Sequence, residues 1–264
     1  MQRVPFYQIN SFTTEQFRGN PAVVVPLERW LSDDEMQAIA VENNVAETTF
    51  FVPTKDKYQI RWFTPKLEID LCGHATLAAA YVLFRELNFK GKKITFRSLS
   101  GDLVVEEINN KFSMNFPKWE LIPFKGCSQD LIDALGKEPI EVLITDPHNN
   151  YFVLYESEQD ILELNPDFEI LGNLDSQGVV VTAPGENSDC VSRFFAPSLG
   201  ISEDPATGSV HCGLAPFWGE RLAKNNIYAK QLSQRGAEIF CAIREDRVLI
   251  SGFAVKYRDG WIEL

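Results

Sequence analysis

RWFTP at residues 61–65 reappears as RFFAP at residues 193–197, and this repeat decides the predicted fold. Each copy is followed by a glycine and a polar residue, at 73–74 and at 208–209, that open a run of small residues typical of a helix. A short sequence that recurs with the same neighbours indicates a duplicated structural unit. We therefore expect two half-domains of one fold, each with a glycine-led helix N-terminus.

Charge and cysteine content argue against several classes of protein. The 264 residues carry a formal net charge of −12, are 45% hydrophobic and give a sequence pI near 4.8. Such an acidic chain without a basic stripe is not expected to bind nucleic acid or an anionic membrane. Its five cysteines are scattered without a CxxC pair, and the N-terminus lacks a signal-peptide pattern. We expect a cytoplasmic enzyme with reduced thiols and room for two cores.

Capping signals and alternation predict the local structure of the first half. Ser32, followed three residues later by Glu35, predicts a capping box and a helix that ends near residues 43–44. The glycine-led helix is expected to end near Leu87, before Gly91. Strands are expected at 4–10, 21–26, 48–52, 58–63, 94–96, 103–108 and 112–116.

The stretch from Pro117 to Cys127 contains prolines and no periodicity, which indicates a domain boundary. We predict an N-terminal half-domain of residues 1–117, completed by a C-terminal strand at 255–264. The second half-domain is then expected to span 118–254.

The second half can be aligned with the first beyond the repeated motif. Ser128 is expected to cap the short helix that opens it. Residues 176–180 align with 46–50, which places Gln177 at the position of Glu47. The predicted scaffold is therefore symmetric, whereas its acid–base chemistry is not.

The two glycine-led helix starts are candidates for anion binding. Amides in the first turn of a helix have no partner inside the helix, and a glycine lets a ligand approach them closely. Gly73 in the first half, and Gly208 with Ser209 in the second, are therefore expected to hold a substrate carboxylate. For an isolated pair of this kind, the alternative is an ordinary turn with Ser209 as a cap.

Glu47 is the candidate general acid–base. It opens a strongly apolar strand, between Val45 and Phe50. A carboxyl group removed from water in such a place can both accept and release a proton near neutral pH. The alternative is a surface glutamate at the start of a strand.

His74 and Asp204 are the remaining candidates with acid–base side chains. Asp204 precedes Gly208 by four residues and is expected either to hold a substrate amine or to orient His74. The alternative for Asp204 is a turn-forming aspartate before proline. Of the other two histidines, His148 is interpreted as a surface residue and His211 as a core or capping residue.

Cys72 directly precedes Gly73, where a thiol could transfer a proton. Racemisation by two bases needs a second ionisable group in the other half, but the corresponding residue is Thr207, which does not ionise near neutral pH. Cys72 is then interpreted as a small buried residue. The spacing of cysteines and histidines matches no structural zinc pattern, and nucleotide-binding motifs are absent from the sequence. We expect no metal and no cofactor.

Four motifs occur in order over nearly the whole chain: FRGNP at 17–21, AETTF at 46–50, LCGHA at 71–75 and EDPATGS at 203–209. With these motifs the chain resembles the phenazine-biosynthesis PhzF-like isomerase family, which shares its fold with diaminopimelate epimerase. The resemblance implies an α+β fold of two pseudo-symmetric α/β domains. Each is expected to be a curved sheet or barrel around a central helix, with the active site in the cleft between the domains.

The resemblance also implies roles for single residues. Glu47 matches the acid–base glutamate of the family, and His74 and Asp204 match further catalytic positions. The expected substrate-binding residues are Asn20, Gly73, Gly208 and Ser209.

The best-known reaction of the family moves a proton within a cyclohexadiene amino acid without metal or organic cofactor. The resemblance therefore implies a cofactor-independent isomerase of a small carboxylate-bearing metabolite, acting as a homodimer. Two alternatives stay open: an amino-acid racemase or epimerase that uses Cys72, and a non-catalytic metabolite-binding protein on the same scaffold.

Overall fold

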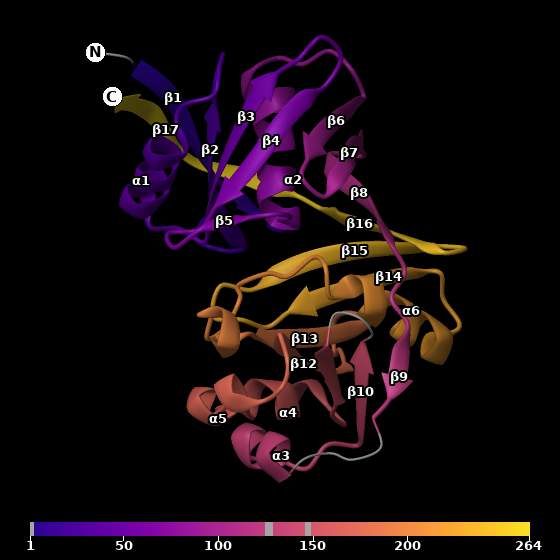
Figure 1. Ribbon diagram of the computed structural model, residues 1–264. Coiled ribbons are helices and arrows are strands. Elements are labelled where there is room, and N and C mark those ends of the chain that lie inside the picture. The colour runs from indigo at the N-terminus through magenta and orange to yellow at the C-terminus, as the bar shows by residue number, and fades with distance from the viewer. Residues whose placement is uncertain (1–2, 125–128, 146–148) are drawn as a thin grey trace. The chain divides into compact units, whose positions relative to one another are not determined.

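The computed structural model describes residues 3–124, 129–145 and 149–264 (Figure 1). The chain divides into two compact units. Unit 1 comprises Met1–Asn115 with Ser251–Leu264, and unit 2 comprises Phe116–Ile250. The interpretations of Cys127, Ser128 and His148 concern residues outside the described ranges.

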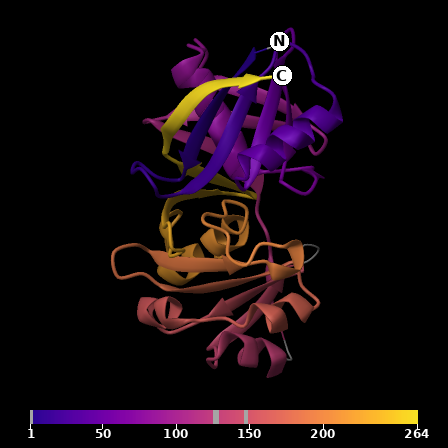
Figure 2. The ribbon, with the colours of Figure 1, turned by 90° about the vertical axis from the view of Figure 1, so that its left-hand side faces the viewer.

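Unit 1 is a curved sheet around one central helix, α2 (Figure 1). The last strand of the chain, β17, pairs antiparallel with β1, so the two ends of the chain lie side by side (Figure 2). The strands are β1 (Arg3–Ser11), β2 (Asn20–Pro26), β3 (Glu47–Pro53), β4 (Tyr58–Phe63), β5 (Glu68–Ile69), β6 (Lys93–Ser98), β7 (Gly101–Ile108), β8 (Lys111–Pro117) and β17 (Ala254–Glu263). The helices are α1 (Asp33–Asn43), α2 (Gly73–Tyr81) and its π-helical continuation η1 (Val82–Glu86).

The two helices of unit 1 form for different reasons. Helix α1 begins with the predicted capping box, because Ser32 and Glu35 each accept the backbone N–H of the other with their side chains. Helix α2 is buried at every residue from His74 to Ala80, which is typical of a helix covered on all sides. It contacts β1, β2, β3, β7 and β17, and its alanines let these strands approach closely.

Unit 2 has its own series of paired strands and a second buried helix, α6, which contacts β14 and β15 (Figure 1). Its strands are β9 (Leu121–Pro123), β10 (Glu141–Thr145), β11 (Asn150–Leu154), β12 (Gly178–Pro184), β13 (Cys190–Phe195), β14 (Asn226–Gln231), β15 (Ala237–Arg244) and β16 (Arg247–Gly252). Its helices are α3 (Gln129–Leu135), α4 (Glu158–Glu163), α5 (Phe168–Asn173), η2 (Pro197–Leu199) and α6 (His211–Leu222). Within the described ranges, no helix is both long and apolar enough to cross a bilayer.

The two units share one strand order, which confirms the predicted pseudo-symmetric fold. In unit 1 the pairs β1–β2, β3–β4 and β6–β7 are antiparallel, whereas β2–β3 and β4–β6 are parallel. In unit 2 the strands β10 to β15 repeat this series of pairings in chain order. The buried helices correspond as well, since α2 precedes β6 and α6 precedes β14.

The antiparallel ladders show that the alignment of residues 176–180 with 46–50 was wrong by one residue. The first arginine of each repeated motif provides a common reference. Arg61 pairs with Phe50, and Arg193 pairs with Val181. Phe50 therefore corresponds to Val181 and not, as the sequence alignment had it, to Val180.

This shift changes the counterpart of Glu47 from Gln177 to Gly178. A Cβ atom at Gly178 would lie 2.5 Å from the ring of Phe194 and 3.0 Å from the carbonyl oxygen of Phe195. Unit 2 therefore has no space for a carboxylate side chain at the position that Glu47 occupies in unit 1.

The repeated arginines themselves have a structural role. Arg61 donates from Nε and Nη2 to the two carboxylate oxygens of Glu68, at 2.7 and 2.6 Å. Arg193 binds Glu203 in the same two-pronged manner, at 2.7 and 3.1 Å. Paired bonds of this kind fix the guanidinium group in the plane of the carboxylate. The repeated arginine thus holds β4 to β5 in unit 1, and in unit 2 it holds β13 to the segment between η2 and α6.

Candidate active site

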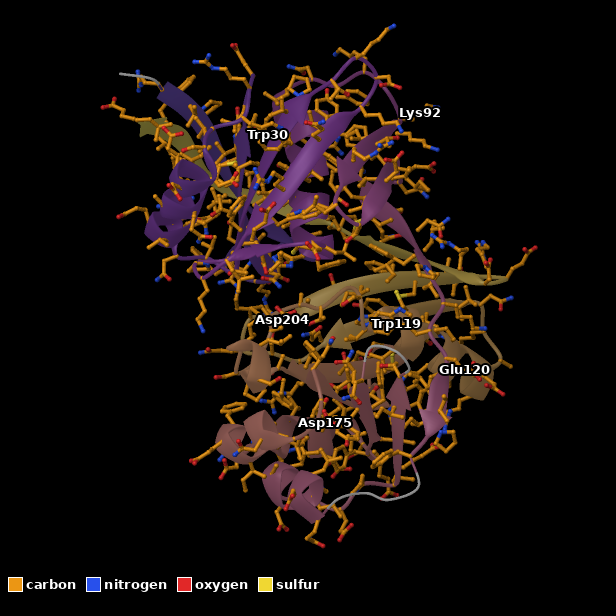
Figure 3. The ribbon with its side chains drawn as sticks, viewed as in Figure 1. Trp30, Lys92, Trp119, Glu120, Asp175 and Asp204 are labelled. Carbon is orange, nitrogen blue, oxygen red and sulfur yellow. The ribbon has the colours of Figure 1, made fainter. Side chains whose placement is uncertain are left out.

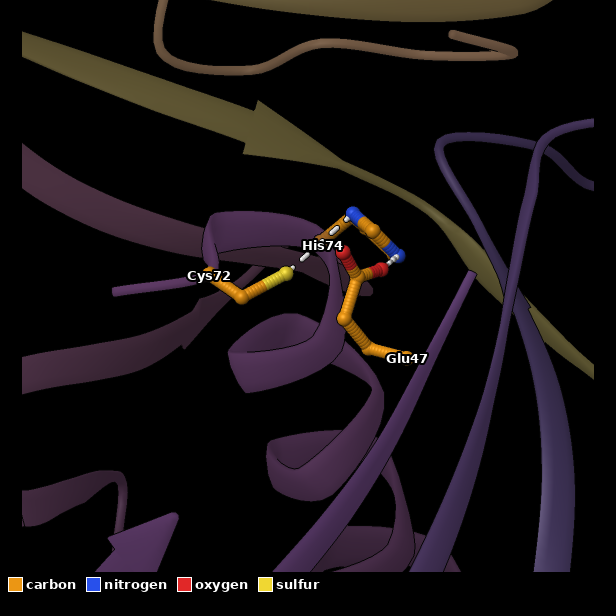
Figure 4. Close-up of side chains that lie close together, drawn as sticks. All are labelled: Glu47, Cys72 and His74. Carbon is orange, nitrogen blue, oxygen red and sulfur yellow. Dashed lines mark hydrogen bonds and ion pairs between the residues drawn. The ribbon is translucent and has the colours of Figure 1, made fainter. Parts of the chain in front are cut away.

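Glu47 and His74 meet in unit 1, as Figure 4 shows. Glu47 is the first residue of β3 and His74 lies in the first turn of α2, so the sheet and its central helix each supply one side chain. The Nε2 atom of His74 lies 2.9 Å from Oε2 of Glu47. His74 is only 7% exposed and Glu47 only 6%. The contact is an ion pair and not an aligned hydrogen bond, because neither atom has a hydrogen-bond partner among the described residues.

The other ring nitrogen of His74 has two neighbours. Nδ1 lies 3.4 Å from the sulfur of Cys72 and 3.3 Å from Nδ2 of Asn20. The backbone of His74 is held too, since the Ser11 hydroxyl donates to its carbonyl oxygen at 2.8 Å. The imidazole is therefore fixed between three side chains, those of Glu47, Cys72 and Asn20.

Gly19 keeps Asn20 in place at the start of β2. Gly19 has a φ of +68°, and a Cβ atom there would lie 2.2 Å from the carbonyl oxygen of Ser11. Only glycine fits this close turn between β1 and β2. The glycine of the FRGNP motif is thus explained by the fold, and the asparagine beside it reaches His74.

Charges within the cluster shift the titration of His74 and Cys72. Burial lowers the pKa of His74, but the sulfur of Cys72 and the carboxylate of Glu47 outweigh it and raise this pKa well above its usual value. Burial and the charge of Glu47 raise the pKa of the Cys72 thiol, although His74 and the backbone N–H of Ala75 act in the opposite direction. Near neutral pH, Cys72 is therefore a thiol beside a histidine that holds its proton firmly.

The N-terminus of α2 is suited to an anion. Cys72, at the N-cap, makes no side-chain capping bond, and the first turn has no acidic residue. A Cβ atom added at Gly73 would meet only the terminal methyl group of Met114, at 3.8 Å. Because space and backbone angles would both allow a side chain at Gly73, the glycine is not explained by packing.

Glu47, Cys72 and His74 are also the described residues whose donor atoms gather closely enough for a metal, all within 4.8 Å of one another. The sulfur faces Nδ1 and the carboxylate faces Nε2, on different edges of the ring. A single ion binds one ring nitrogen only. This arrangement favours sharing of protons over coordination of a metal.

The remaining candidates lie in unit 2, where Asp204 belongs to the segment between η2 and α6 (Figure 3). The hydroxyl of Thr207 donates to the carboxylate of Asp204. The buried Gln231 joins the same loop, because its Nε2 donates to the carbonyl oxygen of Asp204 at 2.7 Å and its Oε1 accepts from the N–H of Thr207 at 2.7 Å. Asp204 is thus fixed by Thr207 and Gln231. No motif in the sequence identifies Gln231 as part of this loop.

The second glycine motif is a turn and not the first turn of a helix. Helix α6 begins at His211, later than the sequence predicts. The N–H groups of His211 and Cys212 donate back to the carbonyl oxygens of Gly208 and Ser209, at 3.0 and 2.9 Å. Such bonds three residues apart form a tight turn before the helix proper. Ser209 is exposed and Gly208 is buried.

His211 is a core residue, as the sequence indicates. It is fully buried, and its Nδ1 lies 3.0 Å from the carbonyl oxygen of Thr207. Burial lowers its pKa to about 4, against the smaller opposing effect of backbone hydrogen bonds to Thr207 and Gly208. His211 is therefore neutral near pH 7 and donates from Nδ1 to that carbonyl.

Known proteins resemble the chain over almost its entire length. The family model described as phenazine biosynthesis-like protein matches residues 9–260. An uncharacterised isomerase of Pseudomonas aeruginosa is 44% identical over 99% of both chains. A crystal structure of a phenazine biosynthesis protein of the PhzF family from Enterococcus faecalis is 40% identical, covers 100% of both chains and has a TM-score of 0.96.

A more distant solved structure shares the fold alone. It is a hydroxyproline epimerase from Agrobacterium vitis, which is 8% identical, covers 98% of this chain and 92% of its own, and has a TM-score of 0.63. Membership of the family is shown by the matching family model and by the full-length relatives of 40% identity or more, and it does not depend on the hydroxyproline epimerase. The chain belongs to the phenazine biosynthesis-like family of PhzF proteins.

Proposed function

We propose that this protein is an isomerase that moves a proton within a small carboxylate-bearing metabolite, with Glu47 as the acid–base group. The observation that carries the proposal is the buried carboxylate of Glu47 beside His74, at the N-terminus of α2, which has no side-chain cap. The names of relatives as isomerases support the reaction class. The proposal requires no metal and no organic cofactor.

Each oxygen of Glu47 has a separate task in this proposal. Oε2 lies against His74 at 2.9 Å, which leaves Oε1 to take a proton from one substrate carbon and return it to another. His74 stabilises the negative charge of the carboxylate before the transfer. A carboxylate and a fixed histidine of this kind contribute about 10²- to 10⁴-fold to a proton-transfer rate.

The amides at the start of α2 are the proposed site for the substrate carboxylate. They combine N–H groups without helical partners with the positive end of the helix dipole. Gly73 lets the ligand come close, and Asn20 adds an amide side chain. The roles of Asp204, Gly208 and Ser209 on the same substrate stay predictions of the sequence.

Exchange of solvent deuterium tests the reaction class. Candidate cyclic and acyclic amino acids are incubated with the protein in heavy water, and deuterium uptake is followed by mass spectrometry and NMR. We expect uptake at carbon for at least one candidate. Binding without any uptake would instead support a non-catalytic metabolite-binding protein.

The variant Glu47→Gln tests the assigned residue. It keeps size and polarity but cannot carry the proton, so turnover should fall by about two orders of magnitude or more while ligand binding is retained. Glu68→Gln is the matched control, because it removes a carboxylate of the same unit that binds Arg61. A normal rate of deuterium uptake with Glu47→Gln would contradict the role proposed for Glu47.

An epimerase that uses Cys72 is the second candidate, since the thiol lies 3.4 Å from His74. It needs a partner base, and Thr207, the residue that matches Cys72 in the repeat, donates its hydroxyl to Asp204. The isomerase proposal expects Cys72→Ser to stay active, whereas a thiol-dependent epimerase would lose its activity in that variant.

A further inference from the structure

Cys72 sits where it can control the orientation of the His74 ring. An imidazole can turn about the bond to its Cβ atom, and only one orientation presents Nε2 to Glu47. The ring edge that carries Nδ1 must therefore be held from the other side. Two groups from different elements reach Nδ1: the sulfur of Cys72, just before α2, and the amide of Asn20 on β2.

We propose that Cys72 is a positioning residue, which holds the His74 ring at Nδ1 so that Nε2 faces the carboxylate of Glu47. The proposal rests on the proposed function, because it explains how the charged partner of the acid–base glutamate is kept in place. The role of the cysteine in the LCGHA motif is then neither that of a second catalytic base nor that of a residue which only fills space.

The backbone of Cys72 is fixed firmly enough for this role. Its carbonyl oxygen accepts the hydroxyl of Thr76 at 2.5 Å and the N–H of Thr76 at 3.1 Å. The residue is 7% exposed, so the direction of its side chain is set by packing and not by solvent. A hydrogen bond made by one imidazole nitrogen fixes the orientation of the ring and therefore the direction of the other nitrogen.

Cys72 is suited to hold a proton and not to remove one. The titratable groups that face it are His74 on α2 and Glu47 on β3. Burial and the charge of Glu47 keep it in the thiol form near neutral pH, where its sulfur can accept the Nδ1–H of the protonated His74 ring. A serine hydroxyl can do the same, whereas an alanine cannot. This difference separates positioning from thiolate chemistry.

The decisive measurement is nitrogen-15 NMR of labelled histidine side chains in the intact protein. The chain has three histidines, and His74→Gln identifies the signals of His74. The shifts of Nδ1 and Nε2 report whether each ring nitrogen holds a proton at a given pH, and they do not depend on any substrate. They are recorded against pH for the wild type, Cys72→Ala and Cys72→Ser.

Cys212→Ala is the matched control. Cys212 is also a buried free cysteine, and among the described hydrogen bonds none joins its sulfur to a histidine ring. Its replacement removes a thiol from a core without touching His74. The His74 signals of this variant should equal those of the wild type.

We expect Cys72→Ala to change the His74 signals and lower the pKa of His74, because the sulfur no longer opposes the effect of burial. Cys72→Ser should restore the pattern of proton occupancy at the two ring nitrogens. With a substrate identified by deuterium uptake, kcat/KM should fall about tenfold in Cys72→Ala, the effect of one hydrogen bond, and recover to within about threefold in Cys72→Ser.

Two results would overturn the proposal. Wild-type His74 signals in Cys72→Ala would mean that the cysteine only fills space. Loss of activity in Cys72→Ser equal to that in Cys72→Ala would mean that the thiol itself is required. Normal turnover by Glu47→Gln would refute the proposed function instead, and the NMR comparison would still decide whether Cys72 positions His74.

Discussion

His74 in unit 1 directly follows Gly73, and His211 in unit 2 lies three residues after Gly208. Both histidines are buried, yet their pKa values are shifted in opposite directions. Burial, which outweighs two backbone hydrogen bonds, lowers the pKa of His211 to about 4. In His74 the neighbouring Glu47 and Cys72 reverse the effect of burial. Two buried histidines near the repeated glycines therefore differ because only His74 lies beside a carboxylate.

The sheet register explains why the carboxylate is absent from unit 2. The residue that corresponds to Glu47 is Gly178, and the ring of Phe194 fills the adjacent space. Symmetric pairing of strands therefore coexists with asymmetric chemistry.

Replacement of the two histidines should give the largest contrast. His74→Gln should lower turnover by about two orders of magnitude, because Glu47 loses its charged partner. His211→Gln should leave turnover per folded molecule within about threefold, because His211 has a structural role. Deuterium exchange measured on both variants checks this. Equal losses would break the comparison, since both histidines would then serve the reaction.

The two histidines should also give opposite contributions to the pH dependence of stability. His211 has a lowered pKa when folded, so its contribution is complete above its unfolded pKa of 6.5 and is lost as pH falls towards 4. It should cost the wild type about 2 kcal/mol between pH 7 and pH 4.5. Urea unfolding at both pH values should show a correspondingly smaller loss for His211→Gln.

His74 has the opposite sign. Its pKa is raised in the folded state, so its contribution is complete below pH 6.5 and is lost as pH rises through the raised pKa. The stability difference between the wild type and His74→Gln should therefore shrink as the solution becomes alkaline. A difference that grows with pH would contradict the ion pair with Glu47.

Two glycines should respond differently to alanine. Gly178→Ala should lower the free energy of unfolding by about 1–3 kcal/mol, because its Cβ would meet the Phe194 ring and a backbone carbonyl. Gly73→Ala should leave stability unchanged or raise it by up to about 1 kcal/mol, since the added methyl group has space and suits a helix. It should nevertheless raise KM. An unchanged KM would argue against substrate binding at Gly73.

Removal of the helix caps should give the smallest loss of stability, and the loss should be of similar size in the two units. Ser32 caps α1 and Ser157 caps α4, each with a reciprocal capping box. Ser32→Ala and Ser157→Ala should each cost about 1 kcal/mol of unfolding free energy. Neither should change turnover per folded molecule. Similar losses, measured by thermal and urea unfolding, would sharpen the view that the units share a scaffold and differ in chemistry.

The sequence by itself determined the elements and the repeat. The capping box of Ser32, the strands with their β-branched residues and the small-residue helix after Gly73 follow from local preferences that tertiary contacts did not override. Glu47 and His74 could be selected as candidates because few other residues combine ionisable groups with apolar neighbours. The expected homodimer stays a prediction, because no residue pattern identifies its surface.

The tertiary structure alone decided the register and the neighbours of the site. Strands β3 and β12 are buried on both faces, so the alternation that would fix their register is missing from the sequence. The meeting of Asn20, Cys72 and Glu47 around one imidazole depends on how β2, β3 and α2 pack together. Contacts between distant segments arise from the closing of a curved sheet around a helix, which no local pattern of residues encodes.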